Sequence, residues 1–176
     1  MTKIVQRDAP VLRQIAKEVE VSKIQSKKLQ DILKKMKTAL NKEEDGVAIA
    51  APQIGESLRI FVVSGRAFAV MDKKNPEGEN RVFEDQVFIN PKILKLSKTK
   101  AKMEEGCLSI RWLYGQVERS TKATIQAFDE NGRKFEKGAS GLLAQIFQHE
   151  IDHLDGILFI DKAENIENIP PENLKK

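Results

Sequence analysis

Apolar residues recur along this chain with two different periods, and the change of period separates helices from strands. Between residues 24 and 40 they recur mostly at spacings of three and four, which is typical of an amphipathic helix. Ser22 can cap that helix, and the polar residues 41 to 46 end it. A second helical pattern covers about residues 141 to 154. The apolar positions of the first helix are Ile24, Leu29, Ile32, Leu33, Met36 and Leu40.

Short apolar runs bounded by turn residues predict strands around the second helix. Asn131-Gly132 favours a tight hairpin, and the polar residues 72 to 81 predict an exposed loop. Hairpins in place of regular β-α-β alternation indicate an α+β fold, with antiparallel sheets packed around the second helix. The predicted strands cover residues 58–63, 87–90, 93–96, 117–119, 123–128, 134–136 and 157–160.

Length and composition fit one folded domain. A chain of 176 residues can build one substantial core and is short for two. We predict a single domain over residues 1–176, in which residues 165–176 form a frayed tail. The N-terminus lacks a secretory signal, no apolar run could span a bilayer, and one cysteine cannot form an internal disulfide. We therefore expect a cytoplasmic protein, with an organelle as the open alternative.

Charge adds little to this picture. The net charge of +4 comes partly from lysines of the first helix, which are typical of a solvated face. The few aromatic residues do not alternate with these lysines, so we expect no specific nucleic-acid partner and no membrane partner.

The second helix carries both histidines of the chain. His149 and His153 lie four residues apart, and Glu150 directly follows the first. Residues four apart share a helix face, so both imidazoles can bind one divalent ion, with the glutamate close to a water molecule there. The alternative is an amphipathic helix that carries two histidines by chance. We favour the metal site, because histidine occurs nowhere else.

A catalytic divalent site usually has three protein ligands, so the two histidines need a partner. Cys107, the only cysteine, follows a glycine and two glutamates. It can be the third ligand or a small buried apolar residue, and residue chemistry leaves these two interpretations even. A carboxylate after His153 is another candidate, which would make the protein a peptidase. The available carboxylates are Asp155, Asp161, Glu164 and Glu167.

Three stretches resemble the signature motifs of peptide deformylases, in the same order and at compatible separations. The similarity covers nearly the whole chain except residues 66 to 82 and the tail. The three stretches are Gly46 to Gln53, Glu105 to Ser109 and Gln148 to Gly156. The resemblance implies a hydrolase that takes part in protein biosynthesis by removing the N-formyl group from the initiator methionine of nascent polypeptides, releasing formate.

The same resemblance implies roles for particular residues. Glu150 is the general acid and base, and the Gln53 side-chain amide and the Leu108 backbone N–H stabilise the developing oxyanion. The bound metal is usually Fe²⁺, for which Zn²⁺, Ni²⁺ or Co²⁺ can substitute. The metal ligands by position are Cys107, His149 and His153.

N-formylmethionyl peptides are the implied partners. Such a peptide would lie extended along residues 46 to 48 and 105 to 107, pairing like an added strand. Some family members dock on the ribosome through a long C-terminal helix. The tail of this chain is too short for such a helix, so the resemblance implies a ribosome partner only weakly. The substrate-binding positions are Val47, Ala48, Glu105, Gly106, Leu142, Gln145 and Ile146.

The chain departs from the family pattern at two places. Ala48 stands where the family usually has glycine, and would be strained if that position required a positive φ; otherwise its methyl group narrows the substrate groove. Residues 110 to 115 stand where the family commonly continues with a proline or a small residue. Their Trp112 and Tyr114 belong either to the core or to the groove rim. These departures keep a catalytically silent, peptide-binding relative open as a third hypothesis beside the deformylase and the peptidase.

One further pairing follows from the resemblance. Arg119 matches a family arginine that is expected to pair with Glu105 or Asp152.

Overall fold

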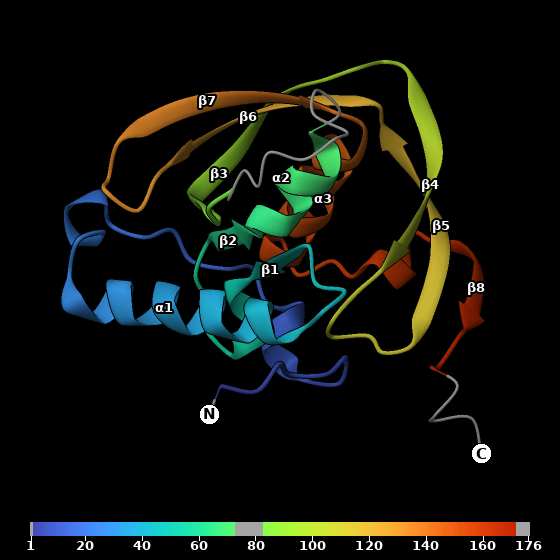
Figure 1. Cartoon of the computed structure of the whole chain (residues 1–176), viewed down its shortest axis with the longest axis horizontal. Helices are drawn as coiled ribbons and strands as arrows, with labels where there is room; N and C mark the ends of the chain where they lie inside the picture. The colour runs from blue at the N-terminus through green and yellow to red at the C-terminus, as the bar shows by residue number, and fades with distance from the viewer. Residues whose placement is uncertain (1, 73–82, 172–176) are drawn as a thin grey trace.

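The computed structural model describes residues 2–72 and 83–171. In these ranges it contains three α-helices, eight β-strands and four short 3-10 turns (Figure 1). The helices are α1 (Lys27–Lys42), α2 (Gly65–Met71) and α3 (Gly141–Leu154). The strands are β1 (Ala48–Ala50), β2 (Ile60–Val63), β3 (Gln86–Leu96), β4 (Lys100–Gly106), β5 (Leu113–Ser120), β6 (Lys122–Phe128), β7 (Lys134–Ser140) and β8 (Glu164–Asn168).

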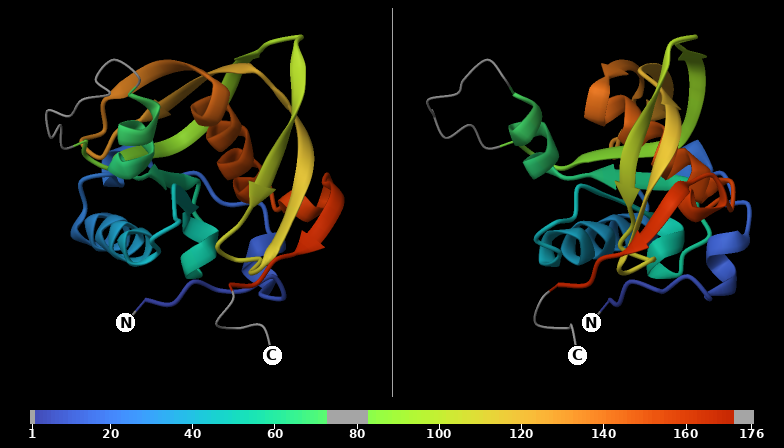
Figure 2. Two further views of the ribbon diagram at one scale, coloured as in Figure 1. Left: turned by 45° about the vertical axis from the view of Figure 1, so that its right-hand side comes forward. Right: turned by 90° about the vertical axis from the view of Figure 1, so that its right-hand side faces the viewer.

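The strands form two antiparallel sheets. Five of them pair in the order β1-β2-β3-β6-β7, and the other three in the order β4-β5-β8. Helix α3 lies between the two sheets and contacts strands of both, as Figure 2 shows. This arrangement confirms the predicted α+β fold with antiparallel sheets around the second helix.

Aromatic packing fixes α3 against the larger sheet. Phe61 of β2 stacks on Phe88 of β3 with ring centroids 4.6 Å apart, and Phe147 of α3 lies 5.3 Å from Phe88. All three side chains are fully buried. Because Phe147 faces the sheet, the opposite side of the same helix is turned toward β4 and β5, and it carries the two histidines.

The first helix forms as predicted, but it begins later. Its N-cap is Ser26, whose hydroxyl accepts a hydrogen bond from the Leu29 N–H. Ser22 lies instead in a 3-10 turn, Val21–Lys23. The predicted cap was wrong, because two serines precede the helix and the sequence pattern does not decide between them.

Two predicted strands are one. Residues 87–90 and 93–96 belong to the continuous strand β3, which runs through Pro91. The register with β6 shifts between Ile89 and Lys92, and Asn90 has a φ of 51°. Such a bulge accommodates a residue that has no N–H to donate.

The C-terminal prediction was wrong in two respects. The strand expected at residues 157–160 is replaced by a 3-10 turn, Phe159–Asp161. Residues 164–168, most of which were assigned to the frayed tail, form β8, which pairs with β5. Every β8 side chain is exposed, so the strand has no apolar pattern that could have predicted it.

The region around the predicted loop contains an unexpected element. Residues 65–71 form α2, capped by the hydroxyl of Ser64. The loop prediction for residues 72–81 falls almost entirely outside the described residues, as does the tail beyond residue 171.

Candidate active site

Helix α3 begins and ends where the sequence predicts, and its position along the neighbouring strand is fixed by one amide. The Gln148 carboxamide accepts a hydrogen bond from the Ser120 N–H at 3.0 Å and donates to the Ser120 carbonyl at 2.9 Å. Ser120 is the last residue of β5. The next residue of the helix, His149, is therefore held at a defined height relative to the smaller sheet.

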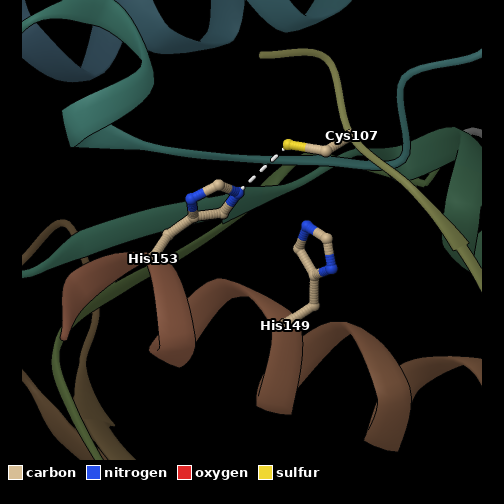
Figure 3. Close-up of side chains that lie close together, drawn as sticks. All are labelled: Cys107, His149 and His153. Atoms are coloured by element: carbon tan, nitrogen blue, oxygen red, sulfur yellow. Dashed lines mark hydrogen bonds between the residues drawn. The ribbon is translucent and has the colours of Figure 1, made fainter. Parts of the chain in front are cut away.

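Cys107 and the two histidines come together from different parts of the fold. One possible ligand atom from each lies within 4.8 Å of the other two. Cys107 directly follows β4, and its Sγ lies 3.2 Å from His153 Nε2 (Figure 3). Both imidazoles extend from α3 toward the thiol in this view. The three form a cluster that could hold a metal ion.

Three of the four carboxylates considered as alternative ligands pair with basic side chains elsewhere. Asp155 pairs with Arg59, Asp161 with Arg13, and Glu164 with Lys102. Glu167 lies on β8, where it is exposed and pairs in register with Tyr114. The geometry therefore groups Cys107, and not these carboxylates, with the histidines.

A buried ionic network supports the histidine that lies nearer the start of the helix. His149 Nδ1 lies 2.8 Å from one carboxylate oxygen of Glu105. Both Glu105 oxygens also accept hydrogen bonds from Arg119, at 2.8 and 3.0 Å, and Arg119 donates to Asp152 at 2.6 Å. Lys162 donates to both carboxylate oxygens of Asp152, at 2.8 Å each. The expected pairing of Arg119 is thus present with both carboxylates at once.

The network sets the charge state of Glu105. Burial alone would raise its pKa, but the hydrogen bonds from His149 and Arg119 outweigh burial and lower the pKa to about 2. Glu105 is therefore a carboxylate at neutral pH. It can orient the His149 ring and leave Nε2 directed at the cluster.

The pKa values of the two imidazoles shift in opposite directions. Burial lowers the pKa of His149, yet hydrogen bonds to Cys107 and Glu105 raise it well above the ordinary value. For His153, burial and the neighbouring His149 keep the pKa well below that value. The hydrogen bonds of His149 therefore favour its charged form, whereas burial favours the neutral form of His153.

Glu150 is the most isolated carboxyl of the site. It is buried, and burial raises its pKa to about 7. Among the described residues, its Oε2 has no hydrogen-bond partner. A buried carboxyl oxygen without a partner is costly, and it is a natural position for a water molecule or a substrate group.

Gln53 is held with its amide donor toward the thiol. The Ala50 N–H donates to its Oε1 at 2.8 Å, so its Nε2 faces Ser109 Oγ at 3.2 Å and Cys107 Sγ at 3.5 Å. Ser109 is fully buried, and sequence reasoning missed its role. Its place in the second signature stretch, two residues after Cys107, was the available signal.

Two members of the cluster, Cys107 and His149, line a cavity of about 280 Å³. Gln53, Leu108, His149 and Glu150 contribute to its lining, whereas His153 is buried behind it. All seven predicted substrate-binding positions line this one cavity. They are Val47, Ala48, Glu105, Gly106, Leu142, Gln145 and Ile146.

Both departures from the family pattern lie at this cavity. Ala48 is within β1, and the described non-glycine residues with positive φ are Asn90 and Asn165, so the alanine is not strained. Trp112 and Tyr114 are half-buried and line the cavity. The Tyr114 ring packs over Gly106, where an added Cβ would lie 2.6 Å from it.

Comparison with known proteins agrees with this geometry. The family profile described as polypeptide deformylase matches residues 1–168. The peptide deformylase of Desulforudis audaxviator is 39% identical over 163 residues, which cover 93% of this chain and 94% of that protein. This chain belongs to the peptide deformylase family. It is therefore an enzyme, a hydrolase that removes the N-formyl group from nascent polypeptides.

Two further relatives extend the comparison. A crystal structure of a class I type b peptide deformylase from Acinetobacter baumannii, with Met-Ala-Ser bound, has a TM-score of 0.78 and 32% identity. The match covers 92% of this chain and 99% of that one. Peptide deformylase 1A of Arabidopsis thaliana, described as chloroplastic/mitochondrial, is 38% identical; the match covers 92% of this chain but 61% of the plant protein.

No helix within residues 2–72 and 83–171 is long and apolar enough to cross a bilayer.

Proposed function

We propose that Cys107, His149 and His153 hold one divalent metal ion at which the formyl group is hydrolysed. The observation that carries this proposal is the convergence of one thiol and two imidazoles within 4.8 Å. One sulfur and two nitrogen donors suit Fe²⁺ and Zn²⁺ alike, and they leave a fourth position for a small molecule. Fe²⁺ is the proposed native ion, with Zn²⁺, Ni²⁺ or Co²⁺ as substitutes.

When bound, such an ion acidifies water and polarises the formyl carbonyl. Glu150 is the proposed acid and base. Its Oε2 removes a proton from the attacking water and later gives that proton to the departing amine, so that amide and water become amine and formic acid, which ionises to formate by giving its proton to the amine. Its burial beside His149 and the lack of a partner for Oε2 among the described residues support this role.

Gln53 and Leu108 are proposed to stabilise the negative charge that develops on the formyl oxygen. The Ala50 N–H holds Gln53 Oε1, so the Gln53 amide N–H groups are oriented toward the cluster before substrate arrives. The backbone N–H of Leu108, next to the thiol, is the second proposed donor. Donors fixed in advance cost no reorganisation during the reaction.

The methionine side chain is proposed to enter the apolar part of the cavity formed by Val47, Leu142 and Ile146. Following residues of the peptide would extend between residues 46–48 and 105–107, with Gln145, Glu105 and Gly106 beside them. The Met-Ala-Ser peptide in the Acinetobacter structure supports a substrate of this kind. Nascent chains in the cytoplasm are the proposed source; the organelle named for the plant relative is the alternative.

Formate release tests the proposal. Protein purified without oxygen and loaded with iron or nickel should release formate from formyl-Met-Ala-Ser. Glu150→Gln should lower kcat by about 10² to 10⁴, because the proton transfer is lost while the metal ligands stay in place. Full activity of that variant would contradict the role of Glu150. No release from folded, metal-loaded wild type would favour a peptide-binding relative instead.

A further inference from the structure

One guanidinium joins the two walls of the cavity at its mouth. Arg111 lies in the loop between β4 and β5, and it donates to both oxygens of Asp45, at 2.6 and 2.9 Å, and to Glu43 at 2.8 Å. Glu43 and Asp45 lie in the loop between α1 and β1, directly before the strand edge. We call these three residues the mouth bridge.

The loop that carries the two carboxylates has a second attachment. Arg66 of α2 donates to the backbone carbonyls of Leu40, Glu43 and Gly46, at 3.1, 2.8 and 3.4 Å. Arg66 therefore ties the loop backbone to the body of the protein, whereas Arg111 ties its side chains to the opposite wall.

The Arg111 guanidinium is held by its hydrogen bonds along its edge and also by an aromatic ring that stacks against its flat face. Its central carbon lies 4.4 Å from the centre of the Trp112 ring. The Trp112 carbonyl accepts a hydrogen bond from the Ile169 N–H, which anchors the loop just beyond β8. A planar fork with five donors can satisfy two carboxylates and stack on an indole, and a lysine cannot do this.

We propose that Arg111 is a positioning residue, which sets the separation of the two backbone edges between which the formyl-peptide lies. This inference rests on the proposed function, in which the peptide pairs with residues 46–48 and 105–107. An extended peptide fits between two edges only when each lies one strand spacing away, about 4.7 to 4.9 Å. The mouth bridge crosses this gap, and none of the proposed reacting groups belongs to it.

The bridge can be broken from either side with opposite changes of charge. Arg111→Met removes the cation, whereas Asp45→Asn with Glu43→Gln removes the anions. If the bridge acts through geometry, both should raise KM for formyl-Met-Ala-Ser by about fivefold, with kcat within twofold. The variant with all three changes should have a KM no higher than that of either partial variant, because each partial variant already breaks the whole bridge. Arg111→Lys should also raise KM, because it keeps the charge and loses the fork.

A short substrate separates this role from a general structural one. N-formylmethionine methylamide ends before it can lie along both edges, so its KM should change by less than twofold in all these variants. Arg13→Met is the matched control, because Arg13 forms a two-point pair with Asp161 and neither residue lines the cavity. It should leave both substrates unaffected.

Three results would overturn the inference: an unchanged KM for the tripeptide, equal losses on both substrates, or KM shifts in opposite directions for the two sides of the bridge. The last would show an effect of charge and not of geometry. Wild-type protein that releases no formate contradicts the proposed function itself, and it is recognised before any variant is compared.

Discussion

Two arginines of this enzyme each hold two carboxylates, yet the two groups differ in burial and in what they adjoin. Arg119 pairs with Glu105 and Asp152, and its side chain is 4% exposed. Arg111 pairs with Asp45 and Glu43 at the mouth, and its side chain is 18% exposed. The inner group contacts His149, whereas the outer group spans the substrate entrance. The same chemical unit therefore orients a proposed metal ligand at one place and a loop at the other.

Burial explains why the two groups should differ in energy. A buried ion pair that loses one partner leaves charges without solvent, whereas exposed carboxylates are solvated again. The pKa of Asp45 is lowered chiefly by its hydrogen bond with Arg111, and the pKa of Glu105 is lowered to about 2 against the effect of burial. We therefore expect the inner group to determine stability and chemistry, and the outer group to determine substrate affinity.

The largest effect on activity should follow from removing the Cys107 thiol, which lies beside His149 of the inner group. Cys107→Ala should lower metal content to below one tenth of an ion per chain, and kcat/KM by more than about 100-fold, since loss of a ligand exceeds loss of an outer partner. Metal content is measured by metal analysis after gel filtration, and kcat/KM is measured from formate release. Both arginine groups remain intact, so the melting temperature of the metal-free chain should hardly change.

Retained metal and retained formate release in this variant would instead favour a carboxylate as the third metal ligand. The matching control is Glu164→Gln, because Glu164 was one of the carboxylates considered and pairs with Lys102 in this structure. It should keep metal and activity near the wild-type values.

The next effect compares the two arginines directly. Arg119→Met should lower the free energy of unfolding by about 3 to 5 kcal/mol, because Glu105 and Asp152 lose their shared buried cation. Arg111→Met should lower it by less than about 1 kcal/mol, because its carboxylate partners are partly exposed. Urea denaturation of the metal-free proteins measures both. Equal losses would contradict the distinction between an inner, stabilising group and an outer one.

The inner group was largely predictable from sequence, and the outer group was not. His149, Glu150 and His153 share one helix turn, so local spacing alone brings them together. The resemblance then supplied Cys107 and the pairing of Arg119. Arg111 and Asp45 are 66 residues apart, and no local rule joins a loop arginine to one of many acidic residues.

The α+β fold was predicted correctly, but two of its strands were missed for similar reasons. Helix α3 and the hairpin after β6 carry strong local signals, namely an apolar stripe and Asn131-Gly132. Strands β4 and β8 consist largely of exposed polar residues, and they exist because β5 offers a partner on each side. Pairing of this kind is tertiary, and it leaves little trace in hydrophobic periodicity.

The smallest expected effect tests whether Trp112 acts on the substrate together with the outer group of Arg111, Asp45 and Glu43. Trp112 stacks on Arg111 and lines the cavity, so Trp112→Ala should remove a contact with residues that follow the methionine. We expect KM for formyl-Met-Ala-Ser to rise about threefold, with kcat unchanged and the melting temperature within about 2 °C. The shift should be absent for N-formylmethionine methylamide. A fall of several degrees with no change in KM would assign Trp112 to the core, and the outer region would then consist of the ion pairs alone.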